Sequence, residues 1–494
     1  MKSSNPIGER PVLSVPGAAR RRRRSLVAAT VVLMLVALTG AISPVASNEL
    51  PNIVVIVADD QGYGDIGVQG AVGFRTPNLD RLASEGVRFD SFYVSQAVCG
   101  ASRASIMTGC YANRISWHGA PGPASRQGLH HDETTLAELL RPAGYATAFY
   151  GKWHLGHLPE FLPTTQGFDE YYGLPYSNDM WPQHPTATDF PGLPLIDGTT
   201  VIDPSVDEHE QSRLTEAYTR RAIDFIDRQR DRPFLLMVEY AMPHVPLFPG
   251  RAFVGSSEQG AYGDVIQEID ASVGRIVDAI DRHGLGERTL IVYTSDNGPW
   301  LSYGNHAGSA GPLREGKGTS WEGGVRVPCL MRMPGTLAAG RVVSETAATI
   351  DLLPTIASFA KRSLPERRID GVDLYPLLVA GDRSNVVDRP YFIWFGTELQ
   401  AVRRGKWKLV LPHAYRTLVE PGADGKPGPY RQQRCGLELY DLEQDLGETT
   451  DVAAANPEIV RELQQLADQA RTALGDSLTG VVGAEVRAPE KASN

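Results

Sequence analysis

The sequence predicts an α/β protein: a large, mostly parallel β-sheet flanked by helices, followed by a smaller C-terminal domain of antiparallel sheet plus helix. Four apolar runs rich in β-branched residues alternate with segments of helical periodicity along most of the chain. Strands that are apolar on both faces are typical of parallel sheets buried between helices. After about residue 388, short strands separated by turns replace this pattern and predict the smaller domain.

The first 47 residues are expected to form a signal peptide. Five consecutive arginines, ending at Arg24, precede an apolar stretch and then small residues near Ser47. This order of basic, apolar and small residues is typical of an export signal. We therefore predict export to the periplasm or the extracellular space, by the general or the twin-arginine route. Membrane anchoring through an uncleaved segment is the less favoured alternative.

Each apolar run is followed by polar residues that could carry chemistry. Ligands of α/β sheets bind at the carboxyl ends of the strands, so we expect these residues to meet at one edge of the sheet. One such cluster alone is more often a turn or a structural residue, but four together are harder to explain in that way. The runs and the residues that follow them are NIVVIVA with Asp59 and Asp60, YATAFYG with Lys152 and His154, PFLLMVEYAM with His244, and TLIVYTS with Asp296 and Asn297.

Two helices between these runs are predicted from their ends and their periodicity. In TPNLDRLASEG, Thr76 is the cap, Pro77 takes the first helical position and Gly86 ends the helix. Residues 264–284 repeat apolar side chains on one face of a second helix. These side chains belong to Val265, Ile269, Val273, Ile276 and Ile280.

The polar residues expected at the sheet edge suit an anion site built around a metal ion. Carboxylate and amide oxygens, without thiolates or paired imidazoles, favour Ca²⁺, or Mg²⁺ in a tighter cage. A metal ion ringed by hydrogen-bond donors stabilises charge on a transferring oxyanion group. The oxygen donors are Asp59, Asp60, Asp296 and Asn297, and the cationic or donating residues are Arg103, Lys152, His154, His244 and Lys317.

Composition excludes one class of partner. The chain has a net charge of −10, and losing the arginine-rich signal makes the remainder more negative. Such a balance argues against nucleic acid as a partner.

The four cysteines leave two interpretations of Cys99 open. In an exported chain, four cysteines suggest two disulfides, and no C-x-x-C or zinc-finger spacing accompanies them. Cys99 is therefore either half of a disulfide, for example with Cys110, or has a less usual role. Residues 102–109 could form a short helix whose N-terminus carries Cys99 and adds backbone donors to the site.

Several motifs resemble those of the sulfatase family, specifically its arylsulfatase A-like branch in the alkaline phosphatase superfamily. CGASRASIMTG, residues 99–109, fits the pattern C-x-[P/A]-S-R followed by T-G, and GKWHLG, residues 151–156, fits a second signature. VADDQGYGDIG, PYSND, SDNGP and LREGKGTSWEGGVRVP occur in the family's order. The resemblance covers nearly all of the chain after the signal. It implies an alkaline phosphatase-like fold and hydrolysis of sulfate monoesters.

The resemblance also implies a use for Cys99. In this family a formylglycine-generating enzyme oxidises the signature cysteine to formylglycine (3-oxoalanine), whose aldehyde is hydrated to a geminal diol. One hydroxyl of the diol attacks sulfur, and the other lets the adduct collapse, which releases sulfate and restores the aldehyde. Conversion of Cys99 would leave Cys110, Cys329 and Cys435, an odd number, so at least one should be free or buried.

Roles for the other residues follow from the same resemblance. Asp59, Asp60, Asp296 and Asn297 would hold Ca²⁺, with Mg²⁺ as the alternative. Arg103 and Lys152 would stabilise the ionised diol. His154 would form a hydrogen bond with the hydroxyl through which the adduct later collapses. His244 and Lys317 would bind the sulfate, and one of the two, His244 in preference to Lys317, would protonate the leaving oxygen. Ser177 would be a further sulfate ligand.

The loops around this site are less informative. Residues 299–313 form either a surface loop or a segment that places Tyr303 and His306 toward the substrate. Residues 418–436 are rich in Gly and Pro, which is typical of a mobile loop at a pocket rim.

The predicted organisation is a signal at residues 1–47, a catalytic domain at 48–387, a C-terminal α+β subdomain at 388–475 and a tail at 476–494 without regular structure. The subdomain should end in a helix that is capped by Asn456 and starts at Pro457. Its apolar face would carry Ile459, Leu463, Leu466, Ala470 and Leu474.

Two rival functions remain open at this point. The first is a phosphonate or phosphate ester hydrolase of the same superfamily, which can share the metal site and the formylglycine. The second is a non-catalytic protein that binds calcium or sulfated glycans and leaves Cys99 unconverted. The natural substrate stays open among sulfated small molecules, glycolipids and glycans.

Overall fold

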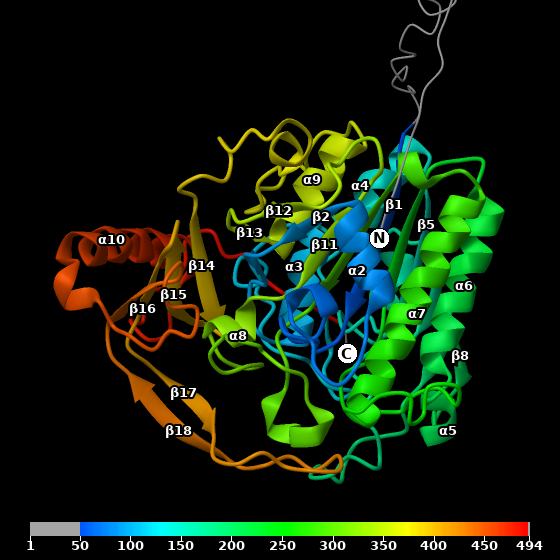
Figure 1. Ribbon diagram of the computed structural model, residues 1–494, viewed down its shortest axis with the longest axis horizontal. Helices are drawn as coiled ribbons and strands as arrows, with labels where there is room; N and C mark the ends of the chain where they lie inside the picture. Colours follow the sequence, from blue (N-terminus) through cyan, green and yellow to red (C-terminus); the bar gives the residue numbers. More distant parts are fainter. Residues whose placement is uncertain (1–49, 493–494) are drawn as a thin grey trace, which may run out of the picture. The chain divides into compact units, whose positions relative to one another are not determined.

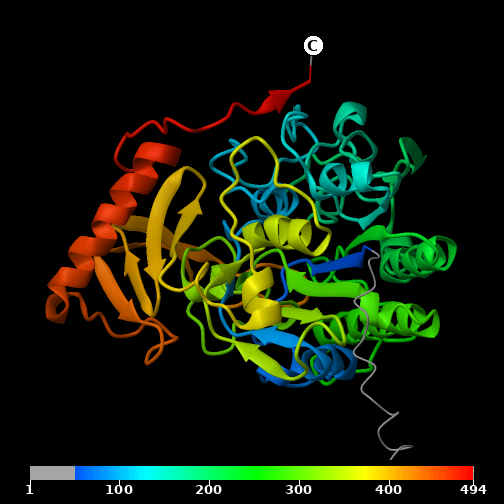
Figure 2. The same ribbon diagram turned by 90° about the horizontal axis from the view of Figure 1, so that it is seen from above.

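The structure, a computed structural model, describes residues 50–492. The predicted signal peptide lies outside the described residues. The chain from Leu50 onward forms one compact unit, in which a large sheet lies between layers of helices and a smaller sheet packs beside it (Figures 1 and 2). The predicted fold class is confirmed. Among residues 50–492, no helix is both long and apolar enough to cross a membrane.

The large sheet has ten strands in the order β12-β2-β11-β10-β1-β9-β5-β6-β7-β8. Its four central strands, β10, β1, β9 and β5, are mutually parallel and are the four apolar runs of the sequence. The strands are β1 (Asn52–Ala58), β2 (Val87–Phe89), β5 (Ala146–Gly151), β6 (Glu170–Gly173), β7 (Leu195–Asp197), β8 (Thr200–Asp203), β9 (Phe234–Glu239), β10 (Thr289–Ser295), β11 (Cys329–Arg332) and β12 (Arg341–Val343).

Helices cover both faces of this sheet and divide the core in two. Side chains alternate along β1: Ile53, Val55 and Val57 face one core, and Val54 and Ile56 face the other. The first core contains α3 (Cys99–Thr108), α4 (Leu136–Leu140) and α9 (Leu352–Phe359), and the second contains α2 (Pro77–Glu85), α6 (Leu214–Gln229) and α7 (Ala261–Arg282). Shorter elements are α5 (Glu208–Gln211), α8 (Glu322–Val325) and a strand pair of β3 (Phe92–Tyr93) with β13 (Ala347–Ala348).

Both helices predicted between the strands are present. Helix α2 starts at Pro77 after Thr76 and stops before Gly86. The five apolar residues predicted on one face of α7 are all buried. The helix starts and the periodicity agree because they are local signals. The predicted caps differ, since neither Thr76 nor Asn456 forms a side-chain capping bond to its helix, and Thr76 Oγ1 instead accepts from the Gly67 N–H at 2.7 Å.

The C-terminal region builds a four-stranded antiparallel sheet that α10 covers. Helix α10 begins at Pro457 as predicted, with Leu463, Ala470 and Leu474 buried and Ile459 and Leu466 partly buried. A separate hairpin, β17–β18, follows the third strand of this sheet. The elements are β14 (Pro390–Phe395), β15 (Glu398–Arg404), β16 (Trp407–Val410), β17 (His413–Leu418), β18 (Tyr430–Cys435), β19 (Glu438–Asp441) and α10 (Pro457–Leu474).

The end of the chain has little regular structure, but a short part of it is paired with the catalytic region. Strand β20 (Glu490–Lys491) pairs with β4 (Gln127–Gly128) of the catalytic region. Arg487 forms an ion pair with Glu133 at 2.6 Å, and the red segment of Figure 2 follows this path. The tail is held by backbone pairing and charges rather than by apolar burial, so hydrophobic patterning gave no indication of it.

Candidate active site

The carboxyl ends of the four central strands meet, as the sequence predicts. Strands β1 and β10 are neighbours in matched register, so the residues that follow them lie side by side. Strands β9 and β5 bring their own following residues to the same edge. The polar residues gathered there are all buried, and they are Asp59, Asp60, Lys152, His154, His244, Asp296 and Asn297.

Three residues after β1 and β10 form a compact group of oxygen atoms. Asp60 has a positive φ of 66°, and its backbone N–H donates to Asp296 Oδ1 at 3.1 Å. Asn297 Nδ2 donates to Asp60 Oδ1 at 2.7 Å. Asn297 Oδ1 is buried and has no hydrogen-bond partner among the described residues. Burying an acceptor without a donor costs free energy of folding, and coordination of a cation by this oxygen would remove that cost.

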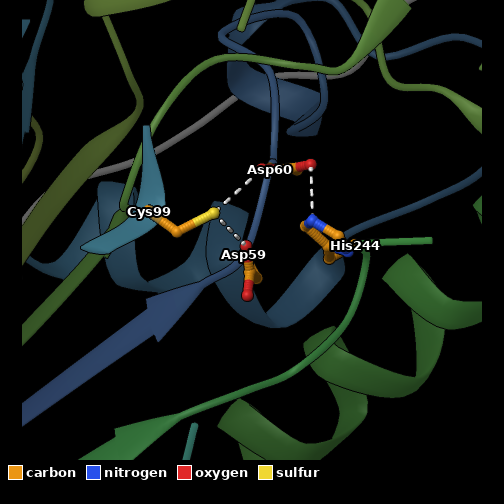
Figure 3. A group of neighbouring side chains, drawn as sticks. All are labelled: Asp59, Asp60, Cys99 and His244. Atoms are coloured by element: carbon orange, nitrogen blue, oxygen red, sulfur yellow. Dashed lines mark hydrogen bonds and ion pairs between the residues drawn. The ribbon is translucent and has the colours of Figure 1, made fainter. Parts of the chain in front are cut away.

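Cys99 is the first residue of α3 and points into this group. Its Sγ lies 3.5 Å from Asp59 Oδ1 and 3.3 Å from Lys317 Nζ. Figure 3 shows the Cys99 side chain directed toward Asp59 and Asp60, with His244 beyond Asp60. The potential ligand atoms of the four residues drawn there, Asp59, Asp60, Cys99 and His244, all lie within 4.8 Å of one another. The buried N-terminus of α3 therefore presents its first side chain to a charged site.

Arg103 lies one helical turn after Cys99 and is surrounded by carboxylates. Its Nε donates to Asp296 Oδ2 at 3.0 Å, and its Nη2 lies 3.2 Å from Asp59 Oδ2. Its Nη1 donates to the Lys152 carbonyl at 2.8 Å and to Glu239 Oε2 at 2.7 Å. The guanidinium is thus fixed from three sides.

Glu239 is a residue of the site that the sequence analysis missed. It ends β9 and is 1% exposed, and burial raises the pKa of its carboxyl to about 8 although Arg103 opposes that shift. The available signal was a carboxylate inside an otherwise apolar strand, five residues before His244.

Lys152 neutralises the carboxylate nearest to Cys99. Its Nζ forms an ion pair with Asp59 Oδ2 and donates to Ser177 Oγ at 3.2 Å. Burial alone would raise the pKa of Asp59, but the charges of Lys152 and Arg103 outweigh it and hold that pKa below its usual value. Asp59 therefore stays ionised at neutral pH.

The two histidines differ in what surrounds them. Burial and the nearby Lys152 lower the pKa of His154 well below its usual value, so this ring is neutral. His154 Nε2 donates to the Pro121 carbonyl at 3.2 Å, and its Nδ1 is a buried acceptor without a partner among the described residues. His244 Nδ1 donates to the Val245 carbonyl at 2.6 Å, which leaves its Nε2 3.5 Å from Ser177 Oγ.

Lys317 reaches the same site from a loop. Its Nζ lies 2.7 Å from Asp60 Oδ1 and 4.4 Å from the centre of the Trp300 ring. The sequence motif alone had predicted that Lys317 belongs to the site. Here the two neighbours hold its ammonium group beside Cys99.

A cavity of about 220 Å³ opens onto these residues. Five predicted residues line it: Cys99, His154, Ser177, His244 and Lys317. The lining also includes residues to which the sequence analysis gave no role, and these are Asp179, Met180, Trp300, Phe395 and Arg416. Tyr303 and His306 do not line this cavity, because Tyr303 is buried against Trp300 and His306 lies beside Gly425.

Of the two interpretations of Cys99, the disulfide is excluded. All four cysteines are free, and three of them are buried. Cys99 and Cys110 flank the ten-residue helix α3, whose length of about 15 Å is far beyond the reach of a disulfide. The interpretation of Cys99 as half of a Cys99–Cys110 pair is thereby excluded.

Comparison with known proteins gives the family of this chain. The family model described as Sulfatase matches residues 51–361, which is more than half of the chain. The chain belongs to the sulfatase family. This sulfatase is 40% identical to human arylsulfatase A over 84% of its own chain and 87% of the relative. It is 38% identical to mouse N-acetylgalactosamine-6-sulfatase over 76% of its own chain and 75% of the relative.

A solved structure extends the likeness to the fold. The crystal structure of the PsFucS1 sulfatase from Pseudoalteromonas sp. matches with a TM-score of 0.77 and 27% identity, over 91% of this chain and 94% of that one. This sulfatase is therefore an enzyme, a sulfuric ester hydrolase of the arylsulfatase type.

Proposed function

We propose that this sulfatase cleaves sulfate monoesters with a formylglycine formed from Cys99 and with a bound divalent cation, Ca²⁺ in preference to Mg²⁺. The observation that supports this most is the position of Cys99, at the buried start of α3 between the Asp59 carboxylate and the Lys317 ammonium. Burial raises the pKa of the Cys99 thiol, so an unmodified thiolate is a poor candidate for the nucleophile.

The oxygen atoms around Asp60 fit a hard divalent cation. Asp59, Asp60, Asp296 and Asn297 would hold it, and the unpartnered Asn297 Oδ1 is the specific observation in favour of that set. When bound, such an ion withdraws electrons from the sulfate oxygens and stabilises the charge that develops on them.

The chain's own residues would guide protons and charge during turnover. The hydrated aldehyde would attack sulfur through one hydroxyl, and its second hydroxyl would lose its proton as sulfate departs. Neutral His154, with a free acceptor at Nδ1, is suited to accept a hydrogen bond from that second hydroxyl and to orient it as its proton passes to water. Arg103 and Lys152 would stabilise negative charge at position 99, and Ser177, His244 and Lys317 would bind the sulfate.

His244 is proposed as the acid that protonates the leaving oxygen. His244→Ala should slow esters of poorly leaving alcohols by about a hundredfold, but esters of activated phenols much less, because an activated phenolate departs without a proton. Initial rates on an alkyl sulfate and on p-nitrophenyl sulfate measure the contrast. Equal losses on both substrates would instead make His244 a residue that only positions the sulfate.

Maturation and location extend the proposal. Cys99 is 2% exposed, so a formylglycine-generating enzyme would have to reach it before the chain folds. Residues 1–47 would direct export, and residues 48–387 and 388–475 would form the catalytic domain and its subdomain. Substrates would be sulfated small molecules, glycolipids or glycans.

Two measurements test the proposal together. The tryptic peptide from Phe89 to Arg103, made alongside a converting enzyme, should have lost one sulfur and two hydrogens and gained one oxygen, and should react with hydrazine reagents. Turnover of p-nitrophenyl sulfate should exceed that of p-nitrophenyl phosphate. A wholly thiol peptide in active enzyme would refute the nucleophile, and faster phosphate turnover would favour the phosphate ester alternative.

A further inference from the structure

The lining of the active-site cavity includes a cation from the C-terminal region. Strands β17 and β18, orange in Figure 1, leave the small sheet and form a separate hairpin. Arg416 lies on β17 and lines the same cavity as Cys99 and Lys317. The hairpin therefore contributes a charged side chain to a site that the catalytic region builds together with Phe395 of β14.

The Arg416 guanidinium is held in a defined position. Its Nη2 donates to the Lys317 carbonyl at 2.7 Å, and its Cζ lies over the Tyr430 ring, 4.6 Å from the ring centre. Gly318 permits this approach, because a Cβ at that position would lie 2.2 Å from Arg416 Nη2. A side chain fixed by a hydrogen bond and a stacked ring loses little entropy when it binds a ligand.

The charge of Arg416 is not neutralised by the protein. Within residues 50–492, no carboxylate lies at ion-pair distance from its guanidinium, and its Nε is buried without a hydrogen-bond partner. Burial alone would raise the pKa of Asp179, which also lines the cavity, but the charges of His244, Lys317 and Lys152 outweigh it and hold that pKa below its usual value. The negative charge of Asp179 is therefore balanced by these neighbours and not by Arg416. A partly buried, unpaired guanidinium that faces a substrate cavity is an anion-binding group.

We propose that Arg416 binds a second anionic group of the substrate, a carboxylate or another sulfate, beside the sulfate ester that is cleaved. The inference rests on the proposed function, since the cleaved ester must occupy the region around Cys99 and Lys317. The preferred substrates would then be sulfate esters that carry a further negative charge close to the scissile group. The neutral part of the substrate would lie against the apolar wall of Met180, Trp300 and Phe395.

Three aryl sulfates test this inference: phenyl sulfate, 3-carboxyphenyl sulfate and 3-sulfooxyphenyl sulfate. The phenols released by the first two have similar acidity, so a difference between them reports binding of the carboxylate. We expect the wild type to have a higher kcat/KM on at least one anionic substrate, and the stronger of the two identifies the anion preferred. Arg416→Gln should lower that preference by about tenfold.

Controls separate the subsite from other roles of Arg416. Arg434→Gln removes the same charge from an exposed position on the same hairpin and should leave the preference unchanged. Arg416→Lys keeps the charge and should retain part of the preference. An equal loss on all three substrates would overturn the proposal, because it would mean that Arg416 only supports Lys317.

The outcome also distinguishes this inference from the proposed function. Hydrolysis of phenyl sulfate without any preference for the anionic substrates would defeat the subsite and leave the function intact. No hydrolysis of any sulfate ester would defeat the function itself. If Arg416→Gln does not fold, inhibition of the wild-type enzyme by 3-hydroxybenzoate and by phenol is compared instead. We expect 3-hydroxybenzoate to inhibit more tightly. Equal inhibition by the two compounds would overturn the subsite.

Discussion

Replacing Cys99 with alanine is expected to lower the turnover of p-nitrophenyl sulfate by at least about a thousandfold, because the nucleophile is removed and no other group can form the covalent adduct. The protein should still fold, since Cys99 contacts Asp59 and Lys317 rather than the apolar core of α3. Steady-state rates give the loss, and thermal unfolding followed by circular dichroism checks the fold.

Cys110→Ala is the matched control. Cys110 is also buried and flanks the other end of α3, where its Sγ approaches Thr108 and Arg368 carbonyls instead of the site. This variant should retain most of the wild-type activity. If Cys99→Ala kept more than a tenth of the turnover, position 99 would not carry the nucleophile.

Removing the Asn297 side chain is expected to weaken Ca²⁺ binding by at least about tenfold and to lower activity in parallel at limiting calcium. Asn297→Ala is a cleaner probe than a change at Asp296, because Asp296 also binds Arg103. Isothermal titration of chelator-treated protein with Ca²⁺ gives the affinity. Added calcium should restore much of the lost rate, which a misfolded variant would not show.

Asn113→Ala provides the comparison for this variant. Asn113 is a buried asparagine whose partners, Gln96 and the Gly396 carbonyl, lie at the boundary with the small sheet. Its loss should leave calcium affinity unchanged. Unaltered affinity in Asn297→Ala, or zinc as the metal found in active protein, would exclude the proposed oxygen site.

The site residues that directly follow the four central strands could be predicted, because sequence patterns indicate where strands end. Runs apolar on both faces mark buried parallel strands, so the residues after them had to share one edge whatever the strand order. Asp59 and Asp296 illustrate this: they lie far apart in sequence and adjacent in space, since β1 and β10 are neighbours in matched register.

Other parts of the site could not be predicted, because they depend on contacts between distant segments. Glu239 belongs to an apolar strand, and only the position of Arg103 on α3 shows why a carboxylate is tolerated there. Arg416 lies on a hairpin about a hundred residues after Lys317, and no local pattern indicates that it returns to the cavity. The state of the four cysteines could not be predicted either, because compartment and cysteine number suggest pairing whereas only the fold shows how far apart the thiols lie.

The buried ion pairs of Lys408 limit which parts of the C-terminal region can be exchanged without loss of stability. Lys408, on β16, is fully buried and pairs with Glu322 of the catalytic region at 3.0 Å and with Glu448 at 2.7 Å. Removing one partner of such a buried pair costs about 3–5 kcal/mol, a large share of the roughly 5–15 kcal/mol that stabilises a domain. Replacing the small sheet with one that lacks a lysine at this position would therefore leave the Glu322 and Glu448 carboxylates buried without their partner. Substitutions on the β17–β18 hairpin, which is not part of that sheet, leave these ion pairs intact, so this hairpin can change without that loss of stability.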